Sequence, residues 1–556
     1  MFQPAERIAL AALDRRASPA DWLRLVDGLH SEPGFWWLDS ALRDESLGRY
    51  SFAGADPYLW LHARLESRPP APRECGAVPG DGAGAESGGE ACASEVEIDV
   101  RREARPGLAR GFHRFASDPF ECARALLPRA DSLVYSTRTS AGSGNPRWHE
   151  VAGLSAGLDL PFLGGAVGYF GYELAAATLP KLRFRNEDEF GLPDLSLAFV
   201  DRVLAYDHSC ERLWVVGLGF GDGRSSSGEG GRQSAVARSR HIVDELAAQV
   251  EWILSLDRPV DAGTPPQEFE SASRRIQSTA DAAGYAKAID TILQEIGAGN
   301  VYQANFSQRL CIETSVDPWR LYGALRKHNP APFGGYFRVG EAAVLSSSPE
   351  RFLRLDDARR VESRPIKGTR PRGDDALCDA RLAAELAGSA KDRAENLMIV
   401  DLVRNDLGRV CAPGSIAVPE LMRIEAYAAV FQMVSTVTGT LATGRDAFDL
   451  VRASFPPGSM TGAPKLAAIS LLEELERVRR GVYAGALGYL DLRGGLDLSV
   501  VIRTLVCKDG QAHLHVGGGV VADSSPEAEY LESLDKAKAP LLALEEILGF
   551  GDENLR

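Results

Sequence analysis

The order in which strand-like and helical stretches follow one another is the sequence feature that most limits the fold. Strand-like runs come in groups, at 195–206 with 213–218 and at 335–339 with 342–346, and another lies at 498–506. Helical periods of apolar residues lie at 22–29, 280–296, 375–386, 392–402, 465–475 and 526–547. A doubly wound sheet needs strict alternation of strand and helix, which this order lacks. The sequence therefore predicts an α+β fold.

Composition and charge limit the class of protein. The chain has 556 residues, of which 45% are hydrophobic and 25% charged, as in an average globular protein. A net charge of −15 disfavours a general nucleic-acid binder or a basic membrane-surface protein. No apolar run reaches the ~18 residues of a membrane helix, and the first residues lack the pattern of a secretory signal. Because the eight Cys are scattered without a CxxC pair, we expect a cytoplasmic enzyme with reduced thiols.

Three stretches, at 67–110, 137–147 and 221–234, are rich in Gly, Ser and Pro and differ in composition from the globular sequence around them. Such segments have too few apolar residues to offset the entropy cost of ordering them. We therefore expect surface insertions there rather than domains. A fourth stretch, at 259–266, has the character of a linker between two halves of the chain.

Two helical segments each carry a pair of acidic residues three positions apart, Asp392 with Glu395 and Glu529 with Glu532. This spacing places both carboxylates of a pair on one face of its helix. If the two faces meet, the carboxylates could hold a hard divalent cation such as Mg²⁺. Spacing alone favours the alternative, two amphipathic faces turned to solvent.

Lys367 lies in a short basic segment, where Pro365 and Gly368 bracket it. These neighbours predict a turn that fixes its backbone. A lysine held inside a site can lose its proton and act as a nucleophile, which arginine cannot do. The alternative, a solvated surface lysine, is favoured by composition alone.

Gly517, Gly518 and Gly519 follow a strand-like run, and Arg503 lies inside the β-rich stretch 498–506. Consecutive glycines let backbone N–H groups approach an anionic ligand closely, although a tight turn is the more common reason for them. A buried arginine needs a carboxylate partner, so Arg503 is a candidate clamp for an acidic ligand. The alternative is a strand residue that faces water.

Several of these segments together resemble one family. The stretches that carry the resemblance are 365–369 (Pro-Ile-Lys-Gly-Thr), 395–409, 457–465 (Pro-Gly-Ser-Met-Thr-Gly-Ala-Pro-Lys) and 502–504. They are similar to the chorismate-utilising enzymes over about 275–546, and weaker matches at 47–51, 161–165 and 168–169 extend the similarity into 1–258. The resemblance implies layered antiparallel β-sheets covered by helices. It also implies an N-terminal region over 1–258 and a chorismate-binding catalytic domain over 275–546, packed as one unit.

The residues that differ among family members favour an aminating enzyme. Members that add water carry a lysine at the position of Gln303, and an amide cannot act as the base that activates water. Anthranilate synthases usually have alanine at the position of Lys367, whereas aminodeoxychorismate synthases have lysine. The resemblance therefore implies component I of an aminodeoxychorismate synthase. The alternatives are component I of anthranilate synthase and a tryptophan-sensing binding protein without activity.

The resemblance also assigns roles to residues. It implies that Lys367 is the nucleophile that attacks chorismate and that Glu350 is the general acid. It implies a Mg²⁺ cofactor bound by Glu395 and Glu532, with Asp392 and Glu529 behind them. The positions that match substrate-binding residues are Gly368, Thr369, Tyr483, Arg503, Gly517, Gly518, Gly519 and Gln303.

Four residues align with a tryptophan-binding site of anthranilate synthases, namely Ser40, Pro332, Phe333 and Gly334. The alignment is imperfect, because Phe-Gly replaces the usual Tyr-Met and the serine is followed by Ala. These departures weaken the expectation of feedback inhibition by tryptophan.

An aminating member of this family needs a source of ammonia. A glutaminase requires a Cys nucleophile on a tight, glycine-flanked turn, and none of the eight Cys lies in a Gly-x-Cys-x-Gly context. The resemblance therefore implies a separate glutamine amidotransferase subunit as partner.

Overall fold

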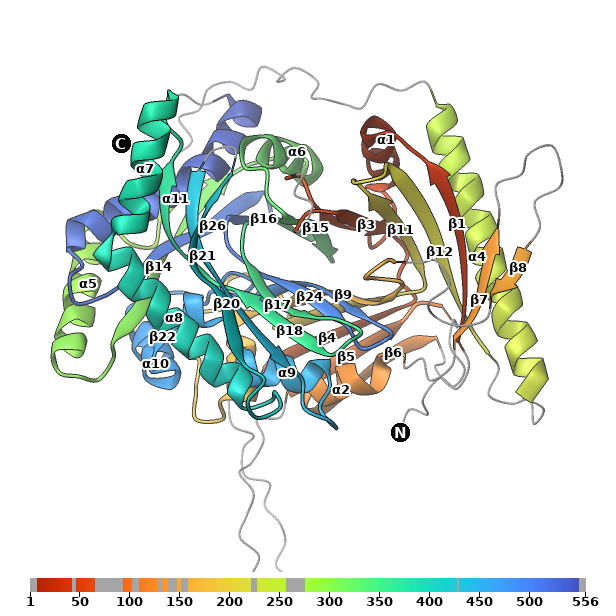
Figure 1. The fold of residues 1–556 in the computed structure, drawn as a ribbon, viewed down its shortest axis with the longest axis horizontal. Coiled ribbons are helices and arrows are strands. Elements are labelled where there is room, and N and C mark those ends of the chain that lie inside the picture. The colour runs from red at the N-terminus through yellow and green to blue at the C-terminus, as the bar shows by residue number, and fades with distance from the viewer. Residues whose placement is uncertain are drawn as a thin grey trace, which may run out of the picture.

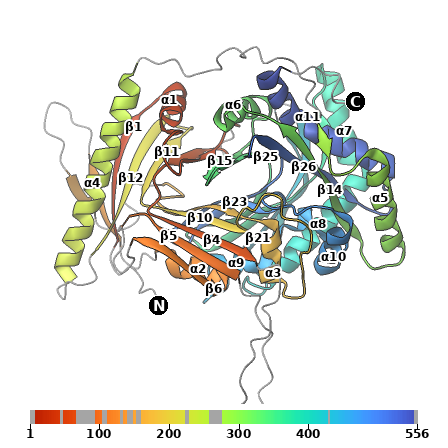
Figure 2. The same ribbon diagram turned by 180° about the vertical axis from the view of Figure 1, so that it is seen from behind.

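The computed structural model describes residues 8–42, 47–65, 94–102, 110–128, 133–138, 148–151, 159–221, 228–256, 276–427 and 430–549. These residues form two large β-sheets with helices on their outer faces and ends (Figures 1 and 2). Apart from β1 and β7, which run parallel, neighbouring strands of the described residues are antiparallel. The α+β fold expected from the sequence is confirmed.

Among the described residues, the first sheet has 14 strands. In spatial order they are β13 (Gln277–Ser278), β14 (Gln303–Glu313), β26 (Gln511–Val520), β25 (Thr504–Lys508), β16 (Ala342–Ser348), β15 (Phe333–Val339), β2 (Trp36–Asp39), β3 (Tyr50–Gly54), β11 (Arg202–Asp207), β12 (Arg212–Phe220), β1 (Ile8–Arg16), β7 (Leu133–Arg138) and β8 (Trp148–Val151), and β22 (Gly462–Ala463) pairs with β14.

The second sheet has 12 strands in the part of the chain that the structure describes. In spatial order they are β19 (Ile366–Pro371), β21 (Val430–Thr440), β18 (Arg360–Arg364), β17 (Arg351–Leu355), β24 (Leu496–Val500), β23 (Ala486–Asp491), β9 (Gly165–Phe170), β10 (Leu195–Val200), β4 (Leu59–Leu65), β5 (Ser94–Val100) and β6 (Gly111–Ser117), and β20 (Ala417–Ala426) pairs with β21.

Both sheets contain strands from the two halves of the chain. In the first sheet, β15 pairs with β2, so that Tyr336 lies opposite Trp37. In the second sheet, β23 pairs with β9, so that Gly488 lies opposite Gly168. Each half therefore completes the sheets of the other. The expected linker at 259–266 lies outside the described residues.

Helices cover the sheets at two ends of the molecule (Figure 1). One end has α1 (Pro19–Leu29) and α4 (Gly228–Ser255), and α4 packs on β1 and β12. The other end has α5 (Ala282–Gly297), α6 (Pro318–His328), α7 (Ala376–Gly388), α8 (Ala390–Gly408) and α11 (Pro526–Leu548). The shorter helices are α2 (Pro119–Leu126), α3 (Ala175–Thr178), α9 (Ala447–Ser454), α10 (Lys465–Leu475), η1 (Tyr172–Leu174) and η2 (Gly458–Met460). No helix of the described residues is both long and apolar enough to cross a membrane.

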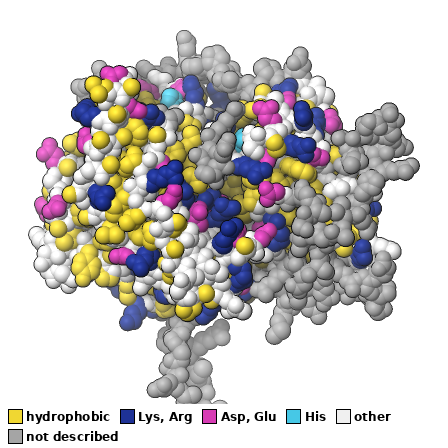
Figure 3. Space-filling model, in the orientation of Figure 1, with side chains coloured by type: hydrophobic (Ala, Val, Ile, Leu, Met, Phe, Trp, Pro, Cys, Tyr) yellow, Lys and Arg dark blue, Asp and Glu magenta, His cyan; other side chains and the backbone are white. Residues whose placement is uncertain are grey.

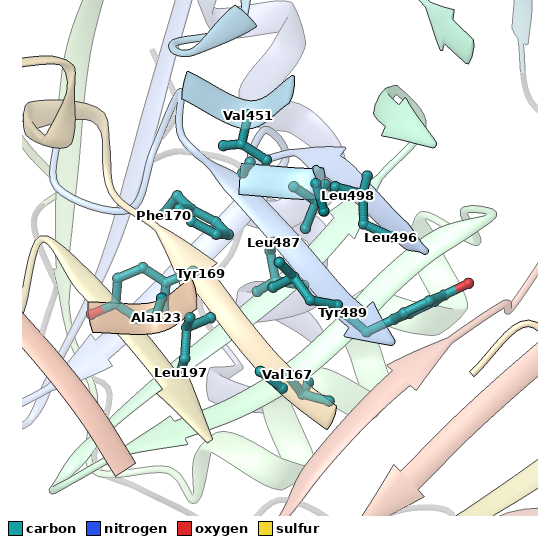
Figure 4. Close-up of a cluster of buried hydrophobic side chains, with 14 of the residues drawn as sticks. Ala123, Val167, Tyr169, Phe170, Leu197, Val451, Leu487, Tyr489, Leu496 and Leu498 are labelled. Atoms are coloured by element: carbon teal, nitrogen blue, oxygen red, sulfur yellow. The ribbon is translucent and has the colours of Figure 1, made fainter. Parts of the chain in front are cut away.

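The largest apolar core is built around the middle of the second sheet. Figure 4 shows Val167, Phe170, Leu197, Leu487 and Leu498 from β9, β10, β23 and β24 in one cluster. The central strands β9, β10 and β23 are buried along their whole length. Full burial requires nearly continuous apolar runs instead of alternation, and this explains the composition of these strands. Burial of apolar surface on both faces stabilises the sheet that carries part of the site below.

The structure corrects three local predictions. Residues 94–100, expected in a surface insertion, form β5 with alternating burial, and residues from 228 onward begin α4. Packing decides both cases, because β5 pairs with β4 and α4 packs against the first sheet. The run 195–206 is two strands, β10 and β11, that belong to different sheets. The remaining parts of the expected insertions, 67–93, 103–109, 139–147 and 222–227, lie outside the described residues.

Candidate active site

Lys367 lies on β19, at one end of the second sheet. The register of β19 against β21 shifts between Ile366 and Thr369, and Gly368 between them has φ of 86°. A β-carbon on Gly368 would be 2.9 Å from the Asp392 side chain. The expected turn is therefore wrong, and Lys367 lies in a strand with a bulge. A bulge re-aims the side chains beside it, which is how it positions a functional residue.

The Lys367 amine faces residues of the first sheet. A β-carbon on Gly519 would be 2.1 Å from Gln303 Nε2 and 3.1 Å from Lys367 Nζ, so these three residues meet. Gln303 is 1% exposed, and neither polar atom of its amide has a hydrogen-bond partner among the described residues. Within the same part of the chain, Lys367 makes no hydrogen bond or ion pair. Unpaired buried polar atoms are costly, and their grouping is typical of a site that a ligand completes.

The three consecutive glycines lie inside β26, so a tight turn is wrong for them. A β-carbon would be 2.1 Å from Phe306 O at Gly517 and 2.9 Å from Glu529 Oε2 at Gly518. Side chains at these positions would collide with the neighbouring strand and with the acids of α11. The glycines therefore let β14, α11 and Lys367 approach the same strand closely.

Glu350 lies between β16 and β17 and is 5% exposed. Burial raises the pKa of its carboxyl to about 7, although a hydrogen bond from the Ser459 hydroxyl, the Lys367 charge and the Ile366 N–H act to lower it. A carboxyl with this pKa can hold and release a proton near neutral pH. Its electrostatic contact with Lys367 places the expected acid beside the expected nucleophile.

The loop that carries Ser459 is anchored by a buried lysine. Lys465 Nζ donates hydrogen bonds to Asp406 Oδ2 at 2.7 Å, to Ser454 O at 2.8 Å and to Pro456 O at 2.9 Å. All three donor hydrogens of the ammonium are thereby used. The ion pair joins α8 to the loop before α10 and so supports the hydroxyl that contacts Glu350.

Arg503 lies near Tyr483 and near Glu532 of α11. Arg503 is in the gap between β24 and β25 with φ of 52°, so its expected place inside a strand is wrong. Left-handed backbone is rare for arginine and marks a position held by its surroundings. Its guanidinium makes no ion pair with a described residue, which leaves it free for a carboxylate. Burial raises the pKa of Tyr483 to about 12, so the hydroxyl stays protonated, and the ring stacks on His515 at 5.0 Å.

The acidic residues of α8 and α11 come together in part. Burial raises the pKa of Glu395, whereas the charges of Lys367 and Lys391 act to lower it. The charges of Glu532 and Glu529 also raise this pKa. Asp392 instead pairs with Arg370, at 3.2 Å, and contacts Gly368. The alternative of two solvated faces is wrong for Glu395 and Glu529, whose side chains are 11% and 2% exposed.

The carboxylates of Glu395, Glu529 and Glu532 could bind a hard cation. They are oxygen ligands, and Glu529 Oε2 is buried without a hydrogen-bond partner. As the side chains stand, no three His, Cys, Asp or Glu of the described residues form a group that could hold a metal. Lysine ammonium groups lie among the acids instead, since Lys391 Nζ is 3.2 Å from Glu529 and Lys536 Nζ is 2.7 Å from Glu532.

The four residues aligned with a tryptophan site, Ser40, Pro332, Phe333 and Gly334, line one cavity of about 790 Å³. Ser40 Oγ donates to Tyr50 O at 2.8 Å and to Pro332 O at 3.1 Å. None of the predicted catalytic residues lines this cavity.

On the face in Figure 3, basic and acidic side chains are interspersed, with several basic ones near the middle.

The sequence reasoning missed four residues of the site: Lys391, Lys536, Ser459 and His515. A signal existed for the two lysines, because Lys391 precedes Glu395 and Lys536 follows Glu532 by four positions, the spacing of helical ion pairs. No local pattern places Ser459 beside Glu350 or His515 beside Tyr483, since each pair is joined only by packing.

Comparison with known proteins decides the family. The family model described as chorismate binding enzyme matches residues 117–542. The chain belongs to this family. One relative of this chorismate-binding enzyme is aminodeoxychorismate synthase of Streptomyces griseus, to which it is 42% identical over 71% of its own length. The match spans about half (52%) of the Streptomyces griseus protein.

Two further relatives carry different names. Component 1 of aminodeoxychorismate synthase of Salmonella typhimurium is 40% identical over 70% of this chain and 78% of its own. Component 1 of anthranilate synthase of Thermus thermophilus is 40% identical over 69% of this chain and 78% of its own length. The crystal structure of anthranilate synthase component I from Streptococcus pneumoniae has a TM-score of 0.65 and 24% identity, covering 90% of this chain and 93% of its own. This likeness confirms the expected layered fold.

Proposed function

We propose that this chorismate-binding enzyme is component I of an aminodeoxychorismate synthase. It converts chorismate and ammonia to 4-amino-4-deoxychorismate, the precursor of 4-aminobenzoate in folate biosynthesis. The observation that carries the proposal is the unpaired Lys367 amine, which lies beside Gln303 and Gly519 and interacts with Glu350. Similarity to relatives named for this activity supports it.

The residues fit a two-step substitution. The Lys367 amine attacks C2 of chorismate, both ring double bonds shift by one position, and the C4 hydroxyl leaves as water with a proton from Glu350. Ammonia then attacks C4, both double bonds shift back, the lysine is released from C2, and the proton lost by the new C4 ammonium returns to Glu350. The nitrogen atom of ammonia replaces the hydroxyl oxygen at C4, and one water molecule is formed.

Charged and polar residues around Lys367 would hold the substrate. Arg503 suits one carboxylate of chorismate through a forked contact, and the protonated Tyr483 hydroxyl can donate a hydrogen bond. Gln303 offers an amide in place of a base, which favours ammonia over water as the second nucleophile. Without side chains, Gly368 and the glycines of β26 would let the ring approach the backbone closely.

Mg²⁺ is part of the proposal. Glu395 and Glu532 would bind it directly, with Glu529 and Asp392 behind them, and the bound cation would neutralise the ring carboxylate of chorismate. The buried, unpartnered Glu529 Oε2 supports this assignment. The source of ammonia is a separate glutamine amidotransferase subunit, and the complex is a heterodimer in the cytoplasm.

Product analysis tests the proposal. The purified chain is incubated with chorismate, Mg²⁺ and ammonium at alkaline pH, and an aminodeoxychorismate lyase is then added. We expect 4-aminobenzoate that forms only after the lyase is added. Formation of 2-aminobenzoate without the lyase would instead assign the chain to anthranilate synthase, the activity for which the Thermus thermophilus relative is named.

A further inference from the structure

One ammonium group bridges the acidic residues of two helices. Lys391 Nζ is 3.2 Å from Glu529 Oε1 on α11 and 3.9 Å from Glu395 Oε1 on its own helix, α8. The two carboxylates are far apart in sequence and come together only in the folded protein. Lys391 thus lies between an expected direct metal ligand, Glu395, and Glu529, which is expected behind the ligands.

Lys391 is poorly placed for a purely structural role. It is the second residue of α8, where the positive end of the helix dipole disfavours a cation. Its side chain is 39% exposed, so rotation of its flexible stem can carry the ammonium into water. Attraction to the two carboxylates is the interaction that holds it over the site.

Glu529, in contrast to the half-exposed Lys391, is buried. Its side chain is 2% exposed, Oε1 also accepts a 2.6 Å hydrogen bond from Ser524 Oγ, and Oε2 has no partner among the described residues. A buried carboxylate with an unused oxygen needs a compensating positive charge. Lys391 supplies that charge in this structure, but it leaves Oε2 unused.

Lys536, which also pairs with an acid of α11, is anchored differently. Lys536 Nζ donates to Gly517 O at 2.8 Å and lies 2.7 Å from Glu532 Oε1 on the same helix. Its bond to the backbone of β26 is independent of the acids. Lys391 makes no such bond to the backbone of any described residue and is therefore the ammonium that can leave.

We propose that Lys391 is an exchangeable counter-ion of the metal site, which neutralises Glu395 and Glu529 until a divalent cation displaces it. This inference rests on the Mg²⁺ site of the proposed function. If Glu395 binds Mg²⁺ at about 2.0–2.1 Å, its carboxylate lies too close to the metal for the Lys391 ammonium, now 3.9 Å from Glu395 Oε1, to keep its position. Metal binding must therefore displace the lysine, and the lysine weakens the binding of metal to the substrate-free protein.

Binding of Mn²⁺, measured by electron paramagnetic resonance without substrate, tests the inference. Compared with wild type, we expect Lys391→Met to bind Mn²⁺ at least about fivefold more tightly, the effect of one unit charge about 4 Å away under water-like screening. Lys391→Arg keeps the charge and should stay close to wild type. Lys538→Met is the matched control, because it removes a charge from an exposed pair with Asp535 on α11 and should change affinity less than about twofold.

The possible outcomes separate this inference from the proposal on which it rests. If wild type binds Mn²⁺ and Lys391→Met binds it equally or more weakly, Lys391 is no counter-ion and the metal site stands. If neither protein binds Mn²⁺, the metal site and the counter-ion role both fail. A thermal melt without metal gives a second readout: Lys391→Met should melt at a lower temperature than wild type, and Mg²⁺ should raise its midpoint by more.

Discussion

Gly519 on β26 and Lys367 on β19 lie so close together that a β-carbon added to Gly519 would be 3.1 Å from Lys367 Nζ. The two strands belong to different sheets. The position of the amine is therefore set by the approach of one sheet to the end of the other, and a glycine is required where they meet.

Gly519→Ala should impair catalysis more than folding. The new methyl group meets the ends of two flexible side chains, those of Gln303 and Lys367, which can move aside at little cost in stability. Displacing the amine by about 1 Å can lower the rate up to about 100-fold. We expect a fall in kcat/KM of about 10- to 100-fold with an unchanged melting temperature. Gly323→Ala, where a β-carbon meets nothing within 4 Å, is the control. An unchanged kcat/KM for Gly519→Ala would show that the contact does not matter.

Lys367→Ala should abolish the covalent adduct with substrate. Mass spectrometry of wild type incubated with chorismate and Mg²⁺, without ammonia, should show the chain with chorismate added and water lost. Lys367→Arg should also form no adduct, because guanidinium stays protonated. Lys287→Ala, an exposed lysine on α5, is the control and should form the adduct normally. Persistence of the adduct in Lys367→Ala would remove this lysine from the role of nucleophile.

The rate of adduct formation should depend on the protonation of Glu350. Burial raises its pKa from 4.5 to about 7, so its contribution as an acid is present below about pH 7 and is lost as pH rises through that value. Single-turnover measurements over a pH series should show this decline in wild type, and Glu350→Gln should be slow without it. A wild-type decline centred far from pH 7 would contradict the assignment.

The same shift has a consequence for stability. The folded protein binds more protons at Glu350 than the unfolded chain does between pH 4.5 and about 7, so the free energy of unfolding contributed by this group falls as pH rises through that range. Above about pH 7 the full cost of burying the charge is present. Urea denaturation at several pH values should therefore show a weaker pH dependence for Glu350→Gln than for wild type.

Lys465→Met should destabilise the protein strongly. It removes the ammonium from a buried ion pair with Asp406 at 2.7 Å and leaves the carboxylate with Arg409 alone. Breaking a buried pair typically costs about 3–5 kcal/mol. The measurement is the free energy of unfolding in urea, and the double variant Lys465→Met, Asp406→Asn should recover part of the loss.

The control for that variant is an exposed pair on α8, the helix that carries Asp406. Arg404→Met breaks the ion pair with Asp401, whose side chains are 53% and 60% exposed, and should cost less than about 1 kcal/mol. Equal losses for Lys465→Met and Arg404→Met would mean that burial of Lys465 contributes nothing to stability.

Much of the secondary structure could be predicted because its pattern is local. The helical period at 465–475 coincides with α10, and the period at 526–547 corresponds to α11. Predictions failed where a neighbour across the sheet decides the backbone. The β-forming neighbours of Arg503 predict a strand there, yet its left-handed φ of 52° interrupts the run. The composition of residues 94–100 predicts an insertion, but pairing with β4 makes them a strand.

The sequence by itself determined the family, the fold class and the residue types of the site, since motifs such as Pro365–Thr369 and the acids spaced three apart are properties of contiguous segments. Only the tertiary structure decided which of these groups meet. Gln303, Gly519 and Lys367 converge from three strands of two sheets, and Lys391 reaches an acid on another helix. The physical reason is the short range of the information in a contiguous segment. Periodicity fixes only which face of its own helix or strand a side chain occupies. The distance between faces of remote elements depends on the packing of the whole core.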